Sequence, residues 1–155
     1  MIQSKYTDWQ GRRASKSIFS AIAGGLWLVA LALPAYTDDT PGLGALIFGW
    51  MLLFDGEILG FVGWLSNFPF VISLFLFMIG RRLGVIQAAM ILSIIACVFS
   101  LGALTVDEVP SYGGSSDVSP YLGCYVWVIA NAMLMVGSII YTARHAAWQF
   151  RNGKM

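Results

Sequence analysis

Long apolar blocks, rather than alternating or amphipathic patterns, dominate this sequence. A membrane-spanning helix needs about 20 predominantly apolar residues at a rise of about 1.5 Å each. Four blocks reach this length: residues 18–36, 43–80, 83–104 and 121–143. The pattern therefore predicts an all-α membrane protein, a four-helix transmembrane bundle in which residues 1–155 form one integral membrane domain. Residues 105–120 are rich in Pro, Gly and Ser and predict a flexible outer loop.

The composition excludes a soluble domain. Apolar residues make up 58% of the chain and charged residues 11%, whereas an ordinary soluble domain has about 25% charged residues. Mean hydropathy is +0.75. A net charge of +1 excludes a strongly basic nucleic-acid-binding surface, and two cysteines are too few for a disulfide scaffold. The expected surroundings are a lipid bilayer.

Basic residues fall in only three places, and these predict the orientation. They precede the first block (Lys5, Arg12, Arg13 and Lys16), separate the second from the third (Arg81 and Arg82) and follow the fourth (Arg144, Arg151 and Lys154). The other two loops carry acids: Asp38, Asp39, Asp107, Glu108 and Asp117. Because basic residues flank spans on the cytoplasmic side, we expect both termini to be cytoplasmic. The short, loop-poor chain favours a bacterial inner membrane.

The first block also has the order of a cleavable signal. A basic region precedes an apolar stretch that contains Ala30-Leu31-Ala32 and the small residue Ala35. The stretch is long and contains Trp27, and cleavage would leave three spans with an external N-terminus. We therefore interpret it as an anchor that begins on the cytoplasmic side.

The second block is too long for one crossing. As one helix, residues 43–80 would extend about 57 Å, nearly twice the hydrocarbon core of about 30 Å. Acids, glycines and a proline interrupt the block at Asp55-Gly56-Glu57, Gly60, Gly63 and Asn67-Phe68-Pro69. In one layout, residues 58–80 cross the membrane and residues 43–54 form an extra apolar helix near the outer face. In the other, residues 43–54 dip into the bundle as a re-entrant segment.

Asp55 and Glu57 are the only acids inside an apolar block. An ionisable group within a membrane is expensive to bury and is therefore a candidate ion- or proton-binding group. The alternative is that both acids lie at the membrane interface and only end a helix. The depth of the two side chains distinguishes these interpretations.

Other polar and small residues in the blocks are typical of helix packing. Asn67 and Asn131 can hydrogen-bond across helices, and Asn67 beside Pro69 can satisfy carbonyls freed at a kink. In the third block, small residues recur at spacings of four and three: Ala89, Ser93, Ala96, Ser100 and Ala103. This spacing predicts a narrow seam for close left-handed packing, against a helix of the same chain or of a second copy.

Few residues suggest chemistry. Cys97 and Cys124 stand in apolar surroundings, which make thiols inert, and His145 is the single histidine. The sequence has no nucleophilic triad motif, no phosphate-binding glycine loop and no zinc-ligand spacing. We therefore expect no enzymatic activity, no cofactor and no metal site.

Three segments resemble pieces of uncharacterised small four-span proteins of bacterial inner membranes: 31–36 (LALPAY), 63–69 (GWLSNFP) and 123–127 (GCYVW). The resemblance covers the first, second and fourth spans and includes no catalytic motif. It implies a compact bundle whose second helix has an Asn-Pro type of interruption, spaced in this chain by Phe68. It implies no function and no active-site residues.

Two classes of function remain. In the first, the protein is non-enzymatic and associates with a membrane protein partner, as an accessory subunit, a toxin-immunity protein or a phage-defence component does. In the second, copies of the chain assemble into a small channel or transporter whose acidic site contains Asp55 and Glu57. Contact with the lipid bilayer is expected in both classes, and nucleic acid in neither.

Overall fold

The computed structural model describes residues 2–36, 41–54, 56–111 and 114–151, with side chains described from residue 16 onward except at 108–116. Most of these residues are helical. In chain order the elements are α1 (Ile2–Ala32), α2 (Gly42–Phe48), the 3-10 helix η1 (Gly49–Leu53), α3 (Ile58–Leu65), α4 (Asn67–Ile79), α5 (Leu83–Ser100), the 3-10 helix η2 (Leu101–Thr105), β1 (Glu108–Ser111), β2 (Gly114–Asp117) and α6 (Leu122–Arg151).

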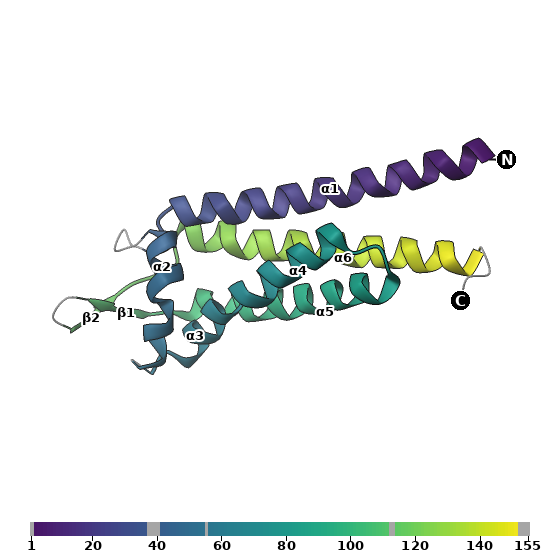
Figure 1. The fold of residues 1–155 in the computed structure, drawn as a ribbon. Helices are drawn as coiled ribbons and strands as arrows, with labels where there is room; N and C mark the ends of the chain where they lie inside the picture. Colours follow the sequence, from purple (N-terminus) through teal and green to yellow (C-terminus); the bar gives the residue numbers. More distant parts are fainter. Residues whose placement is uncertain (1, 37–40, 55, 112–113, 152–155) are drawn as a thin grey trace.

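Four helices, α1, α4, α5 and α6, lie along a common direction and form a bundle (Figure 1). α1 packs along α6, and α5 packs against both α4 and α6. The start of α1, the end of α6 and the turn between α4 and α5 lie at one end, which we call the terminal end. The β1–β2 hairpin and α2 lie at the other, the hairpin end.

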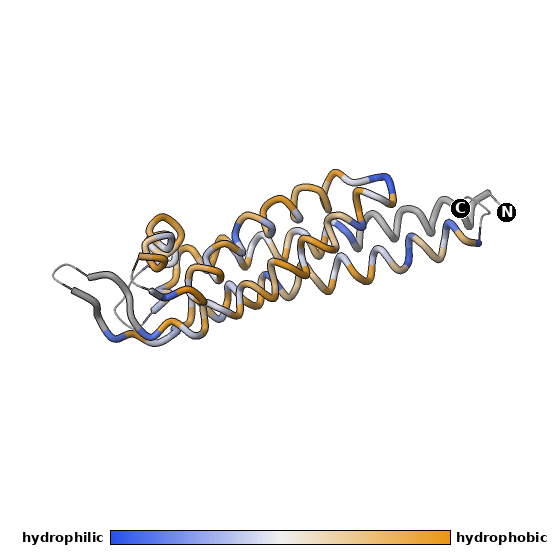
Figure 2. Tube along the Cα trace, turned by 90° about the horizontal axis from the view of Figure 1, so that it is seen from below, coloured by the Kyte–Doolittle hydropathy of each residue, from blue (hydrophilic) through white to orange (hydrophobic). Residues whose placement is uncertain are grey.

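Three helical stretches are long and apolar enough to cross a membrane: Ile58–Ile79, Leu83–Thr105 and Leu122–Arg151. Figure 2 shows hydrophobic residues along most of the bundle and a hydrophilic turn between α4 and α5. The apolar part of α1 whose side chains are described, Lys16–Ala32, is shorter, about 25 Å at 1.5 Å per residue. The length and composition of these helices confirm the prediction of a helical integral membrane protein.

The long second block is broken into separate helices. α2 and η1 run across the hairpin end instead of along the bundle (Figure 1). Gly56, whose φ is 83°, lies between η1 and α3 in a backbone conformation that favours glycine. α3 and α4 meet at Ser66, just before Pro69, which has no N–H to donate to the preceding turn. Residues 43–54 therefore run across the end of the bundle, and the choice between the two predicted layouts, which differ in membrane depth, stays a prediction.

Residues 105–120 contain a β-hairpin that the sequence did not predict. β1 and β2 pair antiparallel, with Glu108 opposite Asp117 and Ser111 opposite Gly114. The segment lacks the alternation of apolar residues by which strands are recognised. It is anchored at its ends instead, because Val106 before β1 and Val118 after β2 are both buried. Residues 108–111 and 114–117 of the expected outer loop are therefore paired, and the flexibility of the loop stays a prediction.

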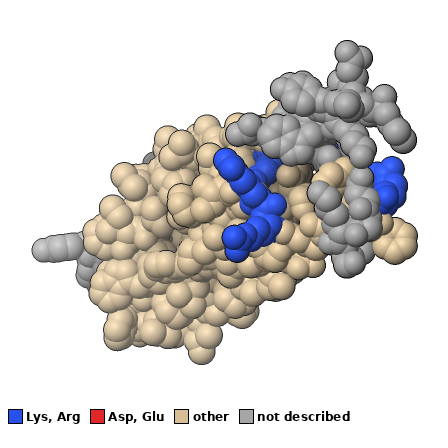
Figure 3. Space-filling model, turned by 45° about the vertical axis from the view of Figure 1, so that its right-hand side comes forward, with Lys and Arg blue, Asp and Glu red and all other residues tan. Residues whose placement is uncertain are grey.

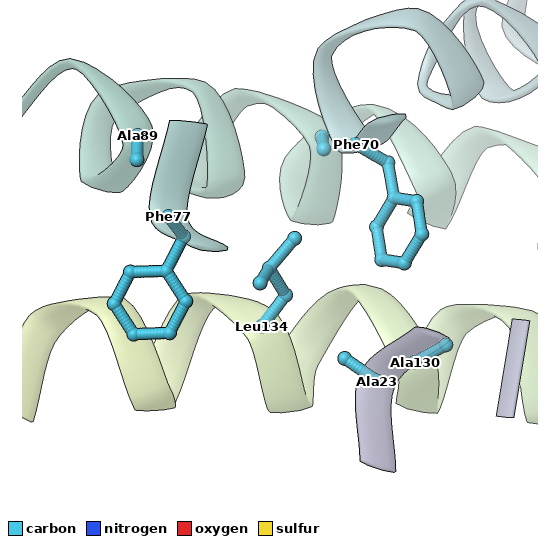
Figure 4. Close-up of a cluster of buried hydrophobic side chains, with 7 residues drawn as sticks. Ala23, Phe70, Phe77, Ala89, Ala130 and Leu134 are labelled. Atoms are coloured by element: carbon cyan, nitrogen blue, oxygen red, sulfur yellow. The ribbon is translucent and has the colours of Figure 1, made fainter. Parts of the chain in front are cut away.

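Large side chains from α4 and α6 fill the centre of the bundle. Phe70, Phe77 and Leu134 are completely buried, and Figure 4 shows them beside alanines of the neighbouring helices, Ala23, Ala89 and Ala130. Lipid supplies no hydrophobic driving force between helices, so close packing of this kind holds a membrane bundle together.

Hydrogen bonds between side chains and neighbouring helices add to this packing. Ser73 Oγ donates to the carbonyl oxygen of Ala89 over 2.7 Å, which joins α4 to α5. The hydroxyls of Ser93 and Ser138 lie 2.7 Å apart and join α5 to α6. Such bonds require the small residues that let the helices approach.

Candidate functional site

The transverse segment Gly42–Leu53, α2 with η1, is docked against α3 by Trp64. We call it the platform. Trp64 Nε1 donates to the carbonyl oxygen of Leu46 over 2.7 Å. The Trp64 ring also covers Gly49, where a Cβ atom would overlap the indole. The ring is itself fixed by Phe61, stacked at 5.7 Å between centroids, and by Phe68, edge-on at 5.3 Å.

The platform has one buried side and one exposed side. Leu52 is buried in a second hydrophobic cluster with Ala35, Tyr36, Val106 and Val118. The other side exposes large apolar side chains: Leu43, Ile47, Phe48, Trp50, Leu53 and the adjoining Phe54. Their exposed fractions run from 45% to 78%. The platform is therefore a fixed apolar surface that no other described part of the chain covers.

Lys16 ties α1 to the end of α4 near the terminal end. Its Nζ donates to the carbonyl oxygen of Gly80 over 2.6 Å, so Lys16 lies level with the end of α4. The ammonium group also lies 5.7 Å from the Phe77 ring centroid and 5.6 Å from that of Tyr141. From Lys16, α1 rises about 24 Å to Ala32. The platform begins beside this point, because Gly42 N–H donates to the carbonyl oxygen of Leu33 over 2.8 Å.

A cavity of about 540 Å³ lies between the platform and the bundle. Its walls come from the platform, the end of α1, α3 and the start of α6. Many of the lining residues are small, among them Gly44, Ala45, Gly60 and Gly123. The walls are formed mainly by apolar atoms, with only a few polar groups among them.

Asn67 and Trp127 are two of the lining residues whose side chains carry polar atoms. Asn67 Oδ1 accepts from Trp27 Nε1 over 3.1 Å, and Asn67 Nδ2 donates to the carbonyl oxygen of Trp64 over 2.9 Å. Trp127 Nε1 is buried and has no hydrogen-bond partner among the described residues. One turn further along α6, Asn131 Nδ2 donates to the Trp127 carbonyl over 3.0 Å, while Asn131 Oδ1 is buried and also lacks a described partner.

Of the predicted acidic pair, only Glu57 belongs to the described residues, and it lies apart from the cavity. Glu57 is the residue before α3, at the hairpin end, and its side chain is partly exposed. It is not among the residues that line the cavity. Asp55 lies outside the described residues, so its side chain is not placed.

The small residues of the third block form the buried side of α5 and η2. Ala89, Ser93, Ala96, Ser100 and Ala103 are all at most 1% exposed. They face helices of the same chain: a Cβ on Gly63 of α3 would overlap the backbone of Ala103, and Cys124 Sγ of α6 lies 3.6 Å from the Ala103 carbonyl. Asn131 is completely buried, and Pro69 is partly exposed in the first turn of α4.

Cys97, Cys124 and His145 lie far apart in the chain and in different settings. Both cysteines are free thiols on spans. His145 stacks on Tyr141 at 6.0 Å between ring centroids, and its Nε2 lies 3.3 Å from Gln149 Nε2. Within the described residues, no three His, Cys, Asp or Glu side chains are grouped so that they could hold a metal ion.

Sequence reasoning did not single out the two tryptophans on which this site depends. Trp64 and Trp127 lie inside apolar blocks, away from the ends where interfacial anchors are expected. An indole N–H in such a position needs an acceptor. That requirement was the signal available in the sequence, although it does not identify the acceptor.

No protein-family model, curated protein or solved structure matches this chain.

Proposed function

We propose that this protein is non-enzymatic and acts by binding a partner protein within the membrane through the exposed side of the platform. The observation that carries the proposal is the rigid docking of an uncovered apolar segment across the hairpin end. Two spans can be joined by only a few residues, as α4 and α5 are. The platform is therefore not needed merely to connect α1 to α3. The chain instead uses the whole platform to present an ordered surface.

We further propose four spans with both termini in the cytoplasm, in the inner membrane of a bacterium. The exposed Arg81, Arg82, Arg144 and Arg151 support this orientation, because all four lie toward the terminal end. On the face seen in Figure 3, basic side chains gather near this end and the remaining described surface is uncharged. Basic residues concentrate on the cytoplasmic side of membrane proteins, and α1 supplies the fourth span.

The height of the platform supports a location inside the membrane. If the hydrocarbon core begins level with Gly80, it extends about 30 Å toward the hairpin end. The platform follows α1 at about 24 Å, which is within the core and close to its outer boundary. A segment at this depth needs no polar side, in contrast to a helix that lies on the membrane surface. This explains why the platform is apolar all round.

Rigidity and aromatic content favour a protein as the occupant of this surface. A surface that is ordered before binding loses little conformational entropy when a partner docks. Aromatic side chains are enriched in the energetically important parts of interfaces, and Phe48, Trp50 and Phe54 are exposed on the platform. A span of a larger membrane protein is the partner that these features fit.

The channel or transporter alternative has less support among the described residues. Phe70, Phe77 and Leu134 fill the bundle centre, and Glu57 lies at the hairpin end outside the cavity walls.

Purification from native membranes tests the proposal. The tagged protein is extracted in mild detergent, and the mass and composition of the complex are determined by mass spectrometry. Phe48→Ala removes a platform ring that is 60% exposed, and Phe75→Ala removes a ring on α4 that is 61% exposed. We expect a second protein in fixed ratio, with recovery about tenfold lower for Phe48→Ala and unchanged for Phe75→Ala. A pure homo-oligomer, or equal effects of both variants, would contradict the proposal.

A further inference from the structure

Three exposed arginines lie at one height near the terminal end, and we call them the arginine layer: Arg81, Arg82 and Arg144. Lys16 gives this height, because its Nζ bonds the Gly80 carbonyl and lies 5.6 Å from the Tyr141 ring centroid. The first two arginines follow Gly80 directly. The third lies three residues after Tyr141 on α6, about 4.5 Å further along the helix. Two distant parts of the chain therefore contribute to one layer.

The arginine layer lies directly beyond a lipid-facing surface. Phe75, Met78 and Ile79 at the end of α4 are apolar and 54% to 62% exposed, as expected of a surface in contact with hydrocarbon. The first arginine of the layer comes two residues after Ile79. Long basic side chains at the ends of spans extend to the level of the lipid headgroups. In the proposed arrangement of spans, the arginine layer therefore lies at the height of the lipid phosphates.

The charges of the arginine layer are not neutralised by the described part of the chain. Its three side chains form no hydrogen bond or ion pair with any residue whose side chain is described. The acids with described side chains, Glu57, Asp107 and Asp117, all belong to the hairpin end. Figure 3 likewise shows no acidic side chain beside the basic ones on the face that it presents. The layer therefore offers positive charge to an external anion.

Phosphate is the anion that fits arginine at this height. A guanidinium group can donate two parallel N–H bonds to phosphate oxygens. A zwitterionic headgroup also brings a cation, for which the layer has no described acid, whereas an anionic headgroup brings none. Basic residues beside a span attract anionic lipids in this way.

We propose that the arginine layer binds the phosphate group of an anionic phospholipid in the adjoining leaflet. The acyl chains of this lipid pack along the exposed apolar side chains of α4, a contact that free phosphate cannot make. The site rests on the proposed spans, but it does not depend on what binds to the platform at the opposite end of the bundle.

Lipid titration of two arginine variants on one helix tests this site. The full chain, in a mild neutral detergent at about 0.15 M salt, is titrated with phosphatidylglycerol or with phosphatidylcholine of the same acyl chains. Native mass spectrometry counts the bound lipids, and inorganic phosphate is the competitor without acyl chains. Arg144→Gln removes a charge from the layer, and Arg144→Lys keeps it. Arg151→Gln is the control, because Arg151 is also exposed on α6 but lies seven residues later, two helical turns or about 10.5 Å further out.

We expect phosphatidylglycerol to bind at least tenfold more tightly than phosphatidylcholine. Arg144→Gln should lower this preference about fivefold, the effect of one basic residue near a membrane surface, and Arg144→Lys should retain it. Arg151→Gln should change it less than about twofold, because its distance from the layer exceeds the Debye length of about 8 Å.

Equal binding of the two lipids, or equal effects of Arg144→Gln and Arg151→Gln, would overturn the proposal. Displacement of the lipid by an equal concentration of inorganic phosphate would also contradict it. No partner protein takes part in this titration, so its failure is distinguishable from failure of the platform proposal, which co-purification decides.

Discussion

Replacement of Trp64 by phenylalanine separates the rigidity of the platform from the stability of the bundle. The Trp64 indole donates to the Leu46 carbonyl over 2.7 Å, at the short end of the range for N–H···O bonds. The acceptor lies in the last turn of α2, just before the chain changes into η1 at Gly49. Trp64→Phe keeps an aromatic ring over Gly49 and leaves the Leu46 carbonyl without this donor.

The expected magnitude follows from the surroundings of the bond. Removal of one partner from a buried hydrogen bond costs about 1–3 kcal/mol, and hydrogen bonds between membrane helices average about 0.6 kcal/mol with a maximum near 1.7. Because the platform is only partly buried, we expect a loss of about 1–1.5 kcal/mol. Each 1.4 kcal/mol is about a factor of ten in an equilibrium constant. Local opening of the platform should therefore become roughly five- to tenfold more frequent.

Hydrogen exchange of backbone amides measures this opening directly. In Trp64→Phe, the amides of Gly42–Leu53 should exchange about five- to tenfold faster, whereas those of α5 and α6 keep their protection. Trp27→Phe is the matched control, since it removes an indole bond of 3.1 Å to Asn67. It should affect α1 and α4 instead of the platform. Unchanged platform exchange in Trp64→Phe would refute the interpretation that this bond docks the segment.

Three further predictions concern the bundle and the acidic residue. Ser93→Leu should lower the unfolding free energy in detergent by about 1–3 kcal/mol or prevent assembly, because Ser93 is completely buried against Ser138. Gly25→Leu, at an exposed position where an added Cβ meets nothing within 4 Å, should unfold like the wild type. Lys16→Met should lower the unfolding free energy by about 1–3 kcal/mol, through loss of a charged hydrogen bond; an unchanged melting temperature would contradict this. Proton and cation flux into reconstituted vesicles should match that of protein-free vesicles, and a flux that Glu57→Gln abolishes would support the transport alternative.

The helical membrane fold was predictable because the lengths of the apolar blocks and the positions of the charged residues can be read directly from the sequence. Broken helices were partly predictable as well, since the interruptions at Gly56 and before Pro69 follow from backbone chemistry. The transverse course of residues 43–54 was not predicted, because helix length alone does not determine direction. The hairpin was missed because its anchors, Val106 and Val118, lie outside the strands.

The candidate site was less predictable than the fold. Acidic residues are unusual inside an apolar block, and the sequence therefore predicted an ion- or proton-binding site at Asp55 and Glu57. The cavity instead depends on tertiary placement: the Trp64 ring meets Gly49 from a different helix, and Trp127 reaches the cavity only because α6 begins beside the end of α1. Such juxtapositions between distant residues leave no pattern in a single sequence.

Position-specific crosslinking in native membranes tests the central claim, that the platform binds a partner protein. A photoreactive phenylalanine analogue is placed at Phe54, which is 78% exposed beside the platform, or at Phe75, which is 61% exposed on α4. The account predicts a discrete crosslinked product with a second protein from Phe54 and only lipid adducts from Phe75. Lipid adducts alone from both positions would contradict it.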